Sequence, residues 1–566
     1  MNTSACVGSD AQSQWRWSLR MAVLVLLGSA FALVFLIDYV GYPHPIVPAL
    51  VLRVLLLRQD VAGLALLAAI AVLACVPAGR RTALAAVDAI GAHPWRTAAV
   101  VFGTLCTAQH VVALDHALAA DEYLTLMQSR IFAEGRLTGD WPPELLPWLM
   151  ADFYRYRWIM VDAHTGDVAS VYWPGFALLL APFSRLGIAW ALNPLLAAVA
   201  LLLLARLARR VAGNPRAAGW AMLLALASPG FAGLALGYFS MTAHLAANLG
   251  YAMLLLRGTP QAAFGAGLIG SLALVLHNPV PHLLFATPWL VWLARKREAR
   301  ACLGRLALGY LPGFAVGLAW ALFLWRLHGF IYFAPFPSDG ALLHEIGNFL
   351  WYWHFRSSHA FGTPDDYSLG GRVGEQVRLW AWSAPALAVL AAIGYWQVRD
   401  RTDANLLAAS FVVTLAGYLF VRFDQGYGWG ARYVHPAWGA LPVFAAVALS
   451  AARATAASLA PWAARAALLS LALALPLRAW QVRDYVAEHL ARRPAYEPGL
   501  RQYVFIDYDR TRYTQDLAQN DPFLREPTVL LVSRGRRADY LFMRMRHPQA
   551  RQVSDQPGRG HVWRLD

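Results

Sequence analysis

Apolar runs of membrane-spanning length alternate with short polar segments along most of this chain, as far as about residue 480. A helix needs about 20 mostly apolar residues to cross the hydrocarbon core of a bilayer, and hydropathy gives about 13 such runs. The predicted spans lie at residues 21–37, 60–77, 97–118, 190–208, 217–235, 240–256, 262–277, 282–294, 305–325, 379–396, 404–421, 436–451 and 461–479. The pattern therefore predicts an all-α polytopic membrane bundle.

Two of the runs are unusual. The run Met21–Ile37 follows Arg16 and Arg20 and resembles a signal peptide, but no small-residue cleavage site precedes Asp38. We interpret it as a retained anchor. The run 282–294 is short and rich in proline, so we expect a broken or re-entrant pair with 262–277.

Composition supports a membrane protein and excludes a soluble globule. Of the 566 residues, 58% are hydrophobic and 14% are charged, with a mean hydropathy of +0.43. The formal net charge of +15 raises the possibility of nucleic-acid binding. The arginines lie mostly between spans or in the tail, however, so they favour membrane topology and contact with anionic lipid. We expect membrane lipid, and no nucleic acid, among the partners.

Arginine placement predicts the orientation of the bundle. Clusters occur at Arg80–Arg96, Arg206–Arg216, Arg295–Arg305, Arg399–Arg401 and Arg453–Arg465. When these clusters are cytoplasmic, the N-terminus is also cytoplasmic. The long loops 119–173 and 326–378, the segment 422–435 and the tail then all lie outside.

The first outer loop and the tail both carry structure. Leu124, Met127 and Ile131 recur at helical spacing before Gly135, which predicts an amphipathic helix over 121–134 on the outer membrane surface. In the tail, the pattern predicts strands and a short helix. The strands are expected at 503–507, 528–532 and 561–565, and the helix at 538–546.

These patterns divide the chain into three parts. Residues 1–96 form extra N-terminal transmembrane helices, and residues 97–480 form the main transmembrane domain with its two long outer loops. Residues 481–566 form a small extracytoplasmic α/β domain.

An acidic pair, Asp121 and Glu122, directly follows the span 97–118. Carboxylates near hydrocarbon are costly, so they are functional candidates. A carboxylate here can act as a general base on an attacking group, and partial burial is expected to raise its pKa. The alternative is a solvated pair that merely suits the N-terminus of a helix.

A second candidate is the segment Gly426–Tyr433, preceded by Arg422. Glycines let the backbone turn tightly, and Arg432 can bind a phosphate with two nitrogens. Trp429 and Tyr433 can stack on a sugar. Alternatively, the segment is an aromatic anchor at the membrane interface.

Histidines give weaker indications. His244 and Asn248 share a helix face and can line a polar cavity, or His244 can be a packing residue held by hydrogen bonds. His110, Asp115 and His116 lie together, but their spacing matches no zinc motif. We predict no metal site and no cofactor, because the sequence gives no support for a divalent metal.

Three motifs, in order, resemble those of the C-type (GT-C) glycosyltransferases. They are Ala120-Asp121-Glu122-Tyr123 with Gly135-Arg136-Leu137, Tyr172-Trp173-Pro174-Gly175 with Ala181-Pro182, and Gly428-Trp429-Gly430-Ala431-Arg432-Tyr433. The resemblance covers about residues 97–480. It is strongest to the protein O-mannosyltransferase and lipid A aminoarabinose transferase group.

The resemblance implies a function. Members of this superfamily take sugars from polyprenyl-phosphate donors at the outer side of the membrane. Asp121 would then be the base, Glu122 would assist it, and Arg432 with Arg422 would hold the donor phosphate. Substrate contacts are also expected from Tyr433, Trp429, His244 and Tyr172. The expected product is an inverted glycoside on an extracytoplasmic glycan, lipid or protein, made in a bacterial inner membrane.

Two departures from the family pattern stand out. The acid pair follows the third span, whereas in many relatives it follows the first, and two extra N-terminal helices explain this. A second acidic motif of the metal-binding kind is not evident, which puts a metal requirement in doubt.

Two other classes of function compete. A transporter or flippase of a lipid-linked saccharide usually shows paired repeats and charges at the midplane. No repeat is evident, and the candidate residues cluster at one surface, which favours an enzyme. The third possibility is a receptor or assembly factor whose tail binds a partner while the bundle anchors it.

Overall fold

The computed structural model describes residues 3–41, 49–152, 154, 158–296, 300–328, 340–363, 366–509 and 513–565. The first helices are α1 (Thr3–Gly41), α2 (Ala49–Leu55), α3 (Val61–Leu73), α4 (Arg80–Ala92), α5 (Pro94–Val111), α6 (Ala120–Ala133), α7 (Leu146–Leu149), α8 (Gly175–Arg185), α9 (Leu192–Ala212), α10 (Ala217–Leu226), α11 (Pro229–Leu234), α12 (Met241–Leu255), α13 (Pro260–Val275) and α14 (Val280–Arg295). The remaining helices are α15 (Arg300–His328), α16 (Leu342–Ala360), α17 (Asp366–Ala381), α18 (Leu387–Val398), α19 (Thr402–Tyr418), α20 (Ala440–Ser450), α21 (Ala454–Leu469), α22 (Leu475–Leu490) and α23 (Arg536–Arg546). Shorter turns include π-helical η1 (Leu56–Asp60) and η6 (Ser470–Ala474), and 3₁₀-helical η2 (Pro143–Leu145), η3 (Ala189–Ala191), η5 (His435–Ala437) and η7 (Thr514–Leu517).

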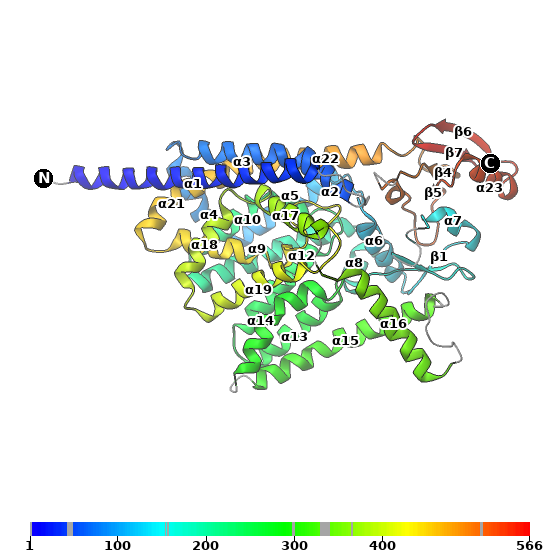
Figure 1. Ribbon diagram of the computed structural model, residues 1–566, viewed down its shortest axis with the longest axis horizontal. Helices are drawn as coiled ribbons and strands as arrows, with labels where there is room; N and C mark the ends of the chain where they lie inside the picture. The colour runs from blue at the N-terminus through cyan, green and yellow to red at the C-terminus, as the bar shows by residue number, and fades with distance from the viewer. Residues whose placement is uncertain are drawn as a thin grey trace.

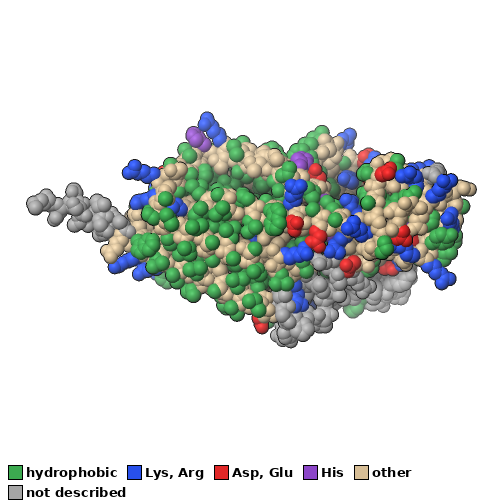
Figure 2. Space-filling model, turned by 90° about the horizontal axis from the view of Figure 1, so that it is seen from above, with side chains coloured by type: hydrophobic (Ala, Val, Ile, Leu, Met, Phe, Trp, Pro, Cys, Tyr) green, Lys and Arg blue, Asp and Glu red, His purple; other side chains and the backbone are tan. Residues whose placement is uncertain are grey.

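The molecule is an integral membrane protein. Among the described residues, five helical segments are long and apolar enough to cross a membrane: Gln12–Tyr39, Val51–Leu73, Ala189–Ala212, Arg300–Leu327 and Ala454–Leu490. Hydrophobic side chains cover the left and central part of the face shown in Figure 2, whereas charged side chains gather at its left edge and over its right half. This arrangement confirms the multi-span interpretation, because a bilayer solvates apolar side chains but not charges.

Several predicted spans are interrupted in the structure. The run 217–235 forms two helices, α10 and α11, because Pro229 begins a new helix there. The run 379–396 is divided between α17 and α18 at Ala386, whose φ is 59°. The short run 282–294 is a continuous helix, α14, in which Pro281 occupies the first turn and Pro288 lies inside. The break in the expected re-entrant pair therefore falls between helices, at residues 276–279.

Three of the arginine-rich turns meet at one end of the bundle. Arg401 donates to the Arg210 carbonyl (3.3 Å), Arg216 pairs with Asp88 (2.8 Å), and Arg80 donates to Gln14 (2.8 Å). The tail sheet and α7 lie at the other end (Figure 1). The tail and these three turns thus lie at opposite ends of the bundle. Residues 153, 155–157, 329–339 and 364–365 of the expected outer loops lie outside the described residues.

Helix α6 matches the predicted amphipathic helix, but its environment differs. Gly135 follows it with φ of 71°, as a helix stop requires. Most of the helix is buried, including Glu122, Leu124, Met127 and Ile131. It therefore packs inside the protein, and the expectation that it lies on the membrane surface is wrong. The apolar face covers protein instead of lipid.

Two small sheets lie beyond the bundle. The first has the antiparallel order β1-β3-β2, from Gly139–Asp140, Asp167–Ser170 and Ile159–Val161. The second has the order β5-β4-β7-β6, from Thr528–Val532, Gln502–Ile506, Gly560–Arg564 and Arg551–Gln556. Strand β4 pairs parallel with β5 and antiparallel with β7. The α/β tail predicted from the sequence is confirmed, apart from β6, which was not predicted.

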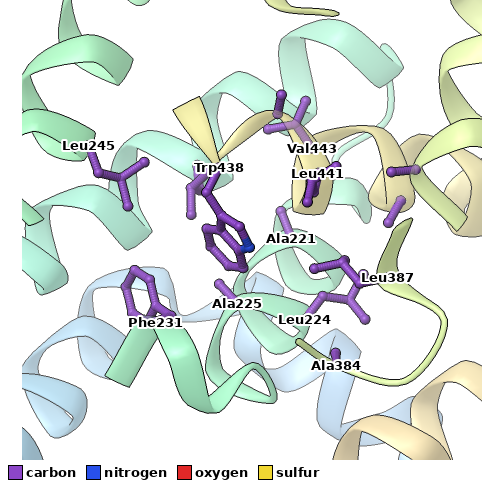
Figure 3. Close-up of a cluster of buried hydrophobic side chains, with 14 of the residues drawn as sticks. Ala221, Leu224, Ala225, Phe231, Leu245, Ala384, Leu387, Trp438, Leu441 and Val443 are labelled. Atoms are coloured by element: carbon purple, nitrogen blue, oxygen red, sulfur yellow. The ribbon is translucent and has the colours of Figure 1, made fainter. Parts of the chain in front are cut away.

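The core has two main parts. In the bundle, Phe231, Trp438, Leu245 and Leu387 pack among small alanines such as Ala221 (Figure 3). A second core joins the first outer loop to the tail, since Trp141 and Leu146 belong to the same buried cluster as Phe505 and Trp563. The loop and the tail therefore form one packed unit at this end of the bundle.

Candidate functional site

The acidic pair opens helix α6, and its first member faces a buried arginine. Nη1 of Arg432 lies 2.9 Å from Oδ2 of Asp121, although the two residues are 311 positions apart. The Tyr172 hydroxyl donates to the other oxygen, Oδ1. The Asp121 side chain is 22% exposed and that of Arg432 is 7% exposed. The structure thus brings three of the predicted site residues together at a partly open position.

Glu122 points elsewhere. Its carboxylate accepts the backbone N–H of Tyr238 on Oε1 (2.7 Å) and that of Leu118 on Oε2 (3.0 Å). Only 3% of the residue is exposed. Glu122 therefore ties the start of α6 to the turn at residues 237–238, and Asp121 alone presents its carboxylate to Arg432.

The glycine-rich segment delivers Arg432 to this position. Gly426, Gly428 and Gly430 have φ values of 56°, 130° and 71°, which residues with a Cβ rarely adopt. Gln425 braces the turn, because its amide donates to the Gly430 carbonyl and accepts from the Arg432 N–H, both at 2.9 Å. The backbone of the segment is thus fixed by its own contacts, independently of Asp121.

Arg432 retains capacity for a further acceptor. Its guanidinium carbon lies 4.7 Å from the centre of the Phe239 ring and 5.6 Å from that of Tyr433. Its Nε is buried and has no hydrogen-bond partner among the residues that the structure describes. A buried donor without a partner is costly, so an oxygen-rich anion at this position would be stabilising.

Tyr172 joins the site to a neighbouring loop. Its ring stacks on His277 with the centres 4.3 Å apart, and its backbone carbonyl accepts from Trp320 (2.9 Å). These contacts hold the Tyr172 hydroxyl on Asp121. His277 lies just after the end of α13.

The two acids have opposite electrostatic environments. Burial raises the pKa of Asp121, but the charge of Arg432, His277 and the Tyr172 hydrogen bond outweigh burial and leave this pKa below its usual value. Burial dominates at Glu122 and raises its pKa to about 7, although backbone N–H groups oppose it. The expectation that burial raises the pKa of the base is therefore wrong for Asp121, since a neighbouring cation favours the charged form.

Of the other predicted residues, Trp429 and Arg422 have partners elsewhere, whereas Tyr433 borders Arg432. Trp429 is 4% exposed, packs on Trp382 and Tyr485, and so presents no free face to a sugar. Arg422 is exposed and lies beside Gly362. Tyr433 stacks on Tyr418 at 4.8 Å and donates to the Asp424 carbonyl.

The histidines singled out from the sequence lie in separate environments. His244 is fully buried in α12, and neither ring nitrogen has a hydrogen-bond partner within the described part of the chain. His110 pairs with Asp115 at 2.8 Å, whereas His116 faces His489. In the described ranges, no group of three or more His, Cys, Asp or Glu side chains can hold a metal ion.

Sequence reasoning missed two further clusters. Asp516 of the tail is buried, accepts a hydrogen bond from the Tyr154 hydroxyl, and lines a small cavity together with Ala120, the first residue of α6. Deeper in the bundle, Asp60 lies between Arg378 and Arg478 at 3.2 Å from each. Asp60 sits at the edge of a predicted span, and a charge at such a position was the available signal.

Comparisons with known proteins give structural matches only. No family model and no curated protein sequence matches this chain. The crystal structure of ArnT from Cupriavidus metallidurans bound to undecaprenyl phosphate matches with 15% identity and a TM-score of 0.49, covering 84% of this chain and 98% of that chain. The apo structure of the same protein matches with 14% identity and a TM-score of 0.45, covering 83% and 98%. The chain is thus similar in structure to ArnT over most of its length, at low sequence identity.

Proposed function

We propose that this protein is a membrane glycosyltransferase that moves a sugar from a polyprenyl-phosphate donor to an acceptor outside the cytoplasm. The observation that carries the proposal is the contact between Asp121 and Arg432 at 2.9 Å. It combines a carboxylate that can accept a proton with a guanidinium suited to phosphate. Both groups are partly or largely buried at the end of the bundle that holds the tail.

In the proposed reaction, an acceptor hydroxyl attacks the anomeric carbon of the sugar. Asp121 takes the hydroxyl proton, the new glycosidic bond forms, and the bond between the anomeric carbon and the phosphate oxygen breaks. Arg432 stabilises the charge on the leaving polyprenyl phosphate, and its unpartnered Nε–H can donate a hydrogen bond to a phosphate oxygen. Direct attack inverts the anomeric centre.

The low pKa of Asp121 suits this role in one respect. The carboxylate is ionised at neutral pH and is ready to accept a proton. Arg432 also reduces its basicity, so movement of Arg432 toward the donor phosphate would strengthen the base at the moment of attack. Tyr172 would keep the carboxylate oriented during this exchange.

The wider setting of the proposal is a GT-C-like bundle of about 13 spans in a bacterial inner membrane. The N-terminus would be cytoplasmic and the tail extracytoplasmic, which places Asp121 on the side where lipid-linked sugars are used. The acceptor would be an envelope glycan, lipid or protein.

The test measures transfer and binding separately in purified protein. Asp121→Asn is expected to reduce transfer from radiolabelled polyprenyl-phosphate sugars to an envelope extract about 100-fold or more, since a general base contributes that much. Arg432→Ala is expected to weaken binding of undecaprenyl phosphate about tenfold or more in native mass spectrometry. Asp115→Asn and Arg399→Ala, at exposed positions, are the matched controls. Wild-type transfer by a correctly inserted Asp121→Asn protein would refute the assignment.

A further inference from the structure

A short stretch of the tail, Thr514–Asn520, contacts the first turn of α6, the turn that carries Asp121. The side-chain amide of Gln519 donates to the Ala117 carbonyl at 2.5 Å. Asn520 and Tyr123 bond reciprocally, since the Tyr123 hydroxyl donates to the Asn520 carbonyl (3.1 Å) and the Asn520 N–H donates to that hydroxyl (3.0 Å). These contacts hold the chain on both sides of Asp121, through the Ala117 carbonyl and the Tyr123 side chain.

Asp516 supplies a contact that the local sequence lacks. The first turns of helices leave backbone N–H groups without intrahelical partners, and these are usually satisfied by a side chain at the N-cap. The N-cap residue of α6 is Ala119, which has no side chain for this purpose. The Asp516 carboxylate instead faces this position: Asp516 and Ala120 line the same small cavity, and the Ala120 backbone opposes the rise in pKa that burial causes at Asp516.

The Asp516 carboxylate is itself held firmly. It accepts the hydroxyl of Tyr154, and that hydroxyl accepts from the Gln515 amide at 3.0 Å. Asp516 is 4% exposed. A buried acceptor with a fixed donor has little freedom to move, so the helix end that it faces is also fixed.

The stretch is anchored in turn to the tail sheet. The Asn520 side chain makes two hydrogen bonds with Leu530 of β5, donating to its carbonyl and accepting its N–H, both at 2.8 Å. Strand β5 pairs with the buried strand β4. The position of Asp121 is thus linked through Asp516 and Asn520 to the rigid part of the tail.

We propose that Asp516 is a positioning residue for Asp121: the tail caps and orients the helix end that presents the carboxylate to Arg432. The inference rests on the proposed function for the role of Asp121. The mechanical part, that Asp516 orders the start of α6, stands on the contacts above and can be tested without any substrate.

The experiment compares Asp516→Ala with the conservative Asp516→Asn in the full-length protein. The alanine removes the acceptor, so amide hydrogen exchange in residues 120–125 is expected to become several-fold faster. The asparagine keeps an oxygen facing Ala120 and should leave exchange close to wild type. Asp555→Ala, on the exposed strand β6 of the same sheet, is the matched control.

Transfer kinetics provide the second measurement. Asp516→Ala should lower kcat about 10- to 100-fold, because small misplacements of a catalytic group have effects of that size. KM for the donor should change less than twofold, since Arg432 is fixed by its own segment. Asp516→Asn should restore most of kcat. A purely structural role would reduce the yield of folded protein without this split between kcat and KM.

The outcomes separate the two proposals. Unchanged exchange in residues 120–125 of Asp516→Ala, or faster exchange with unchanged kcat per folded molecule, would overturn the positioning role. Wild-type transfer by Asp121→Asn would overturn the proposed function, whatever the exchange data show.

Discussion

At the scale of single residues, the adjacent acids Asp121 and Glu122 lie in different environments. Asp121 faces a guanidinium and a hydroxyl, whereas Glu122 accepts two backbone N–H groups in a closed position. Their pKa values move apart as a result, below the usual value for Asp121 and to about 7 for Glu122. Neighbouring titratable groups with such divergent environments are typical of sites that transfer protons.

The raised pKa of Glu122 makes a prediction about stability. An unfolded Glu ionises near 4.5, whereas folded Glu122 ionises near 7. Between these values the native state retains a proton that the unfolded state has released, so stability falls as pH rises from about 4.5 to about 7. The effect is at most about 3 kcal/mol. Glu122→Gln should show a smaller fall than wild type when thermal unfolding in detergent is compared at pH 5 and pH 8.

Glu134→Gln is the control for this prediction, because Glu134 is half exposed at the far end of α6 and pairs with Arg525. The Asp516 carboxyl, whose pKa burial raises to about 7, adds a fall of the same sign that both variants retain. Equal falls in wild type and Glu122→Gln would show that the Glu122 carboxyl does not titrate in this range.

At the scale of elements, α6 is held by a turn from the bundle as well as by the tail. Gly237 has φ of 78°, and a Cβ at this position would lie 2.1 Å from Oε1 of Glu122. The same turn is fixed by Gln109, which accepts the Gly237 N–H, and by Asn193, which donates to the Gly237 carbonyl. The turn can approach Glu122 so closely only because residue 237 has no side chain.

Gly237→Ala should therefore damage both stability and transfer. Gly213→Ala is a matched variant, because Gly213 ends α9 with φ of 64° and has nothing within 4 Å of its Cβ position. Both variants incur a cost of about 1–2 kcal/mol for an alanine in the left-handed region. Only Gly237→Ala displaces Glu122, so it should unfold at a clearly lower temperature and lose transfer activity. Similar unfolding temperatures for the two variants would contradict the close contact.

The elements also show what the sequence can and cannot predict. Helix α6 and strands β4, β5 and β7 follow from periodicity and apolar runs, because each buries one continuous set of side chains. Strand β6 is largely exposed and polar, so it carries no such pattern. The burial of α6 also escaped prediction, since the elements that pack against it, α8 and β3, lie later in the chain. Apolar periodicity marks a buried face without identifying what covers it.

The same limit applies to the candidate site. The acid pair and Arg432 could be found because charges beside apolar spans are costly. Trp429 and Asp516 could not be placed, since a tryptophan suits a core as well as a sugar and an acid in a polar tail is unremarkable. The position of Trp429 depends on long-range packing against Trp382, and that of Asp516 depends on its contacts with Tyr154 and Ala120.

At the scale of the whole molecule, a buried ionic cluster joins three distant parts of the bundle. Asp60 ends η1, Arg378 lies in α17 and Arg478 lies in α22. All three are at most 3% exposed as side chains, and Trp382 also donates to Asp60 at 2.6 Å. Arg478 has further partners in the carbonyls of Gln59 (2.7 Å) and Ala381 (2.9 Å). One carboxylate thus compensates the charge of two guanidinium groups at a position that solvent does not reach.

Removal of that carboxylate should be far more harmful than removal of a surface acid. Asp60→Asn leaves two buried cations without their counter-ion, which typically costs about 3–5 kcal/mol. Asp88→Asn breaks the exposed pair with Arg216 and should cost at most about 1 kcal/mol. Thermal unfolding in detergent, supported by the yield of monodisperse protein, measures both.

Because Asp60→Asn alone is expected to fold poorly, the double variant with Arg378→Met provides the decisive comparison. This variant removes one unpaired cation and should recover part of the lost stability. An Asp60→Asn protein as stable as Asp88→Asn, or no recovery in the double variant, would mean that the cluster does not link these helices electrostatically.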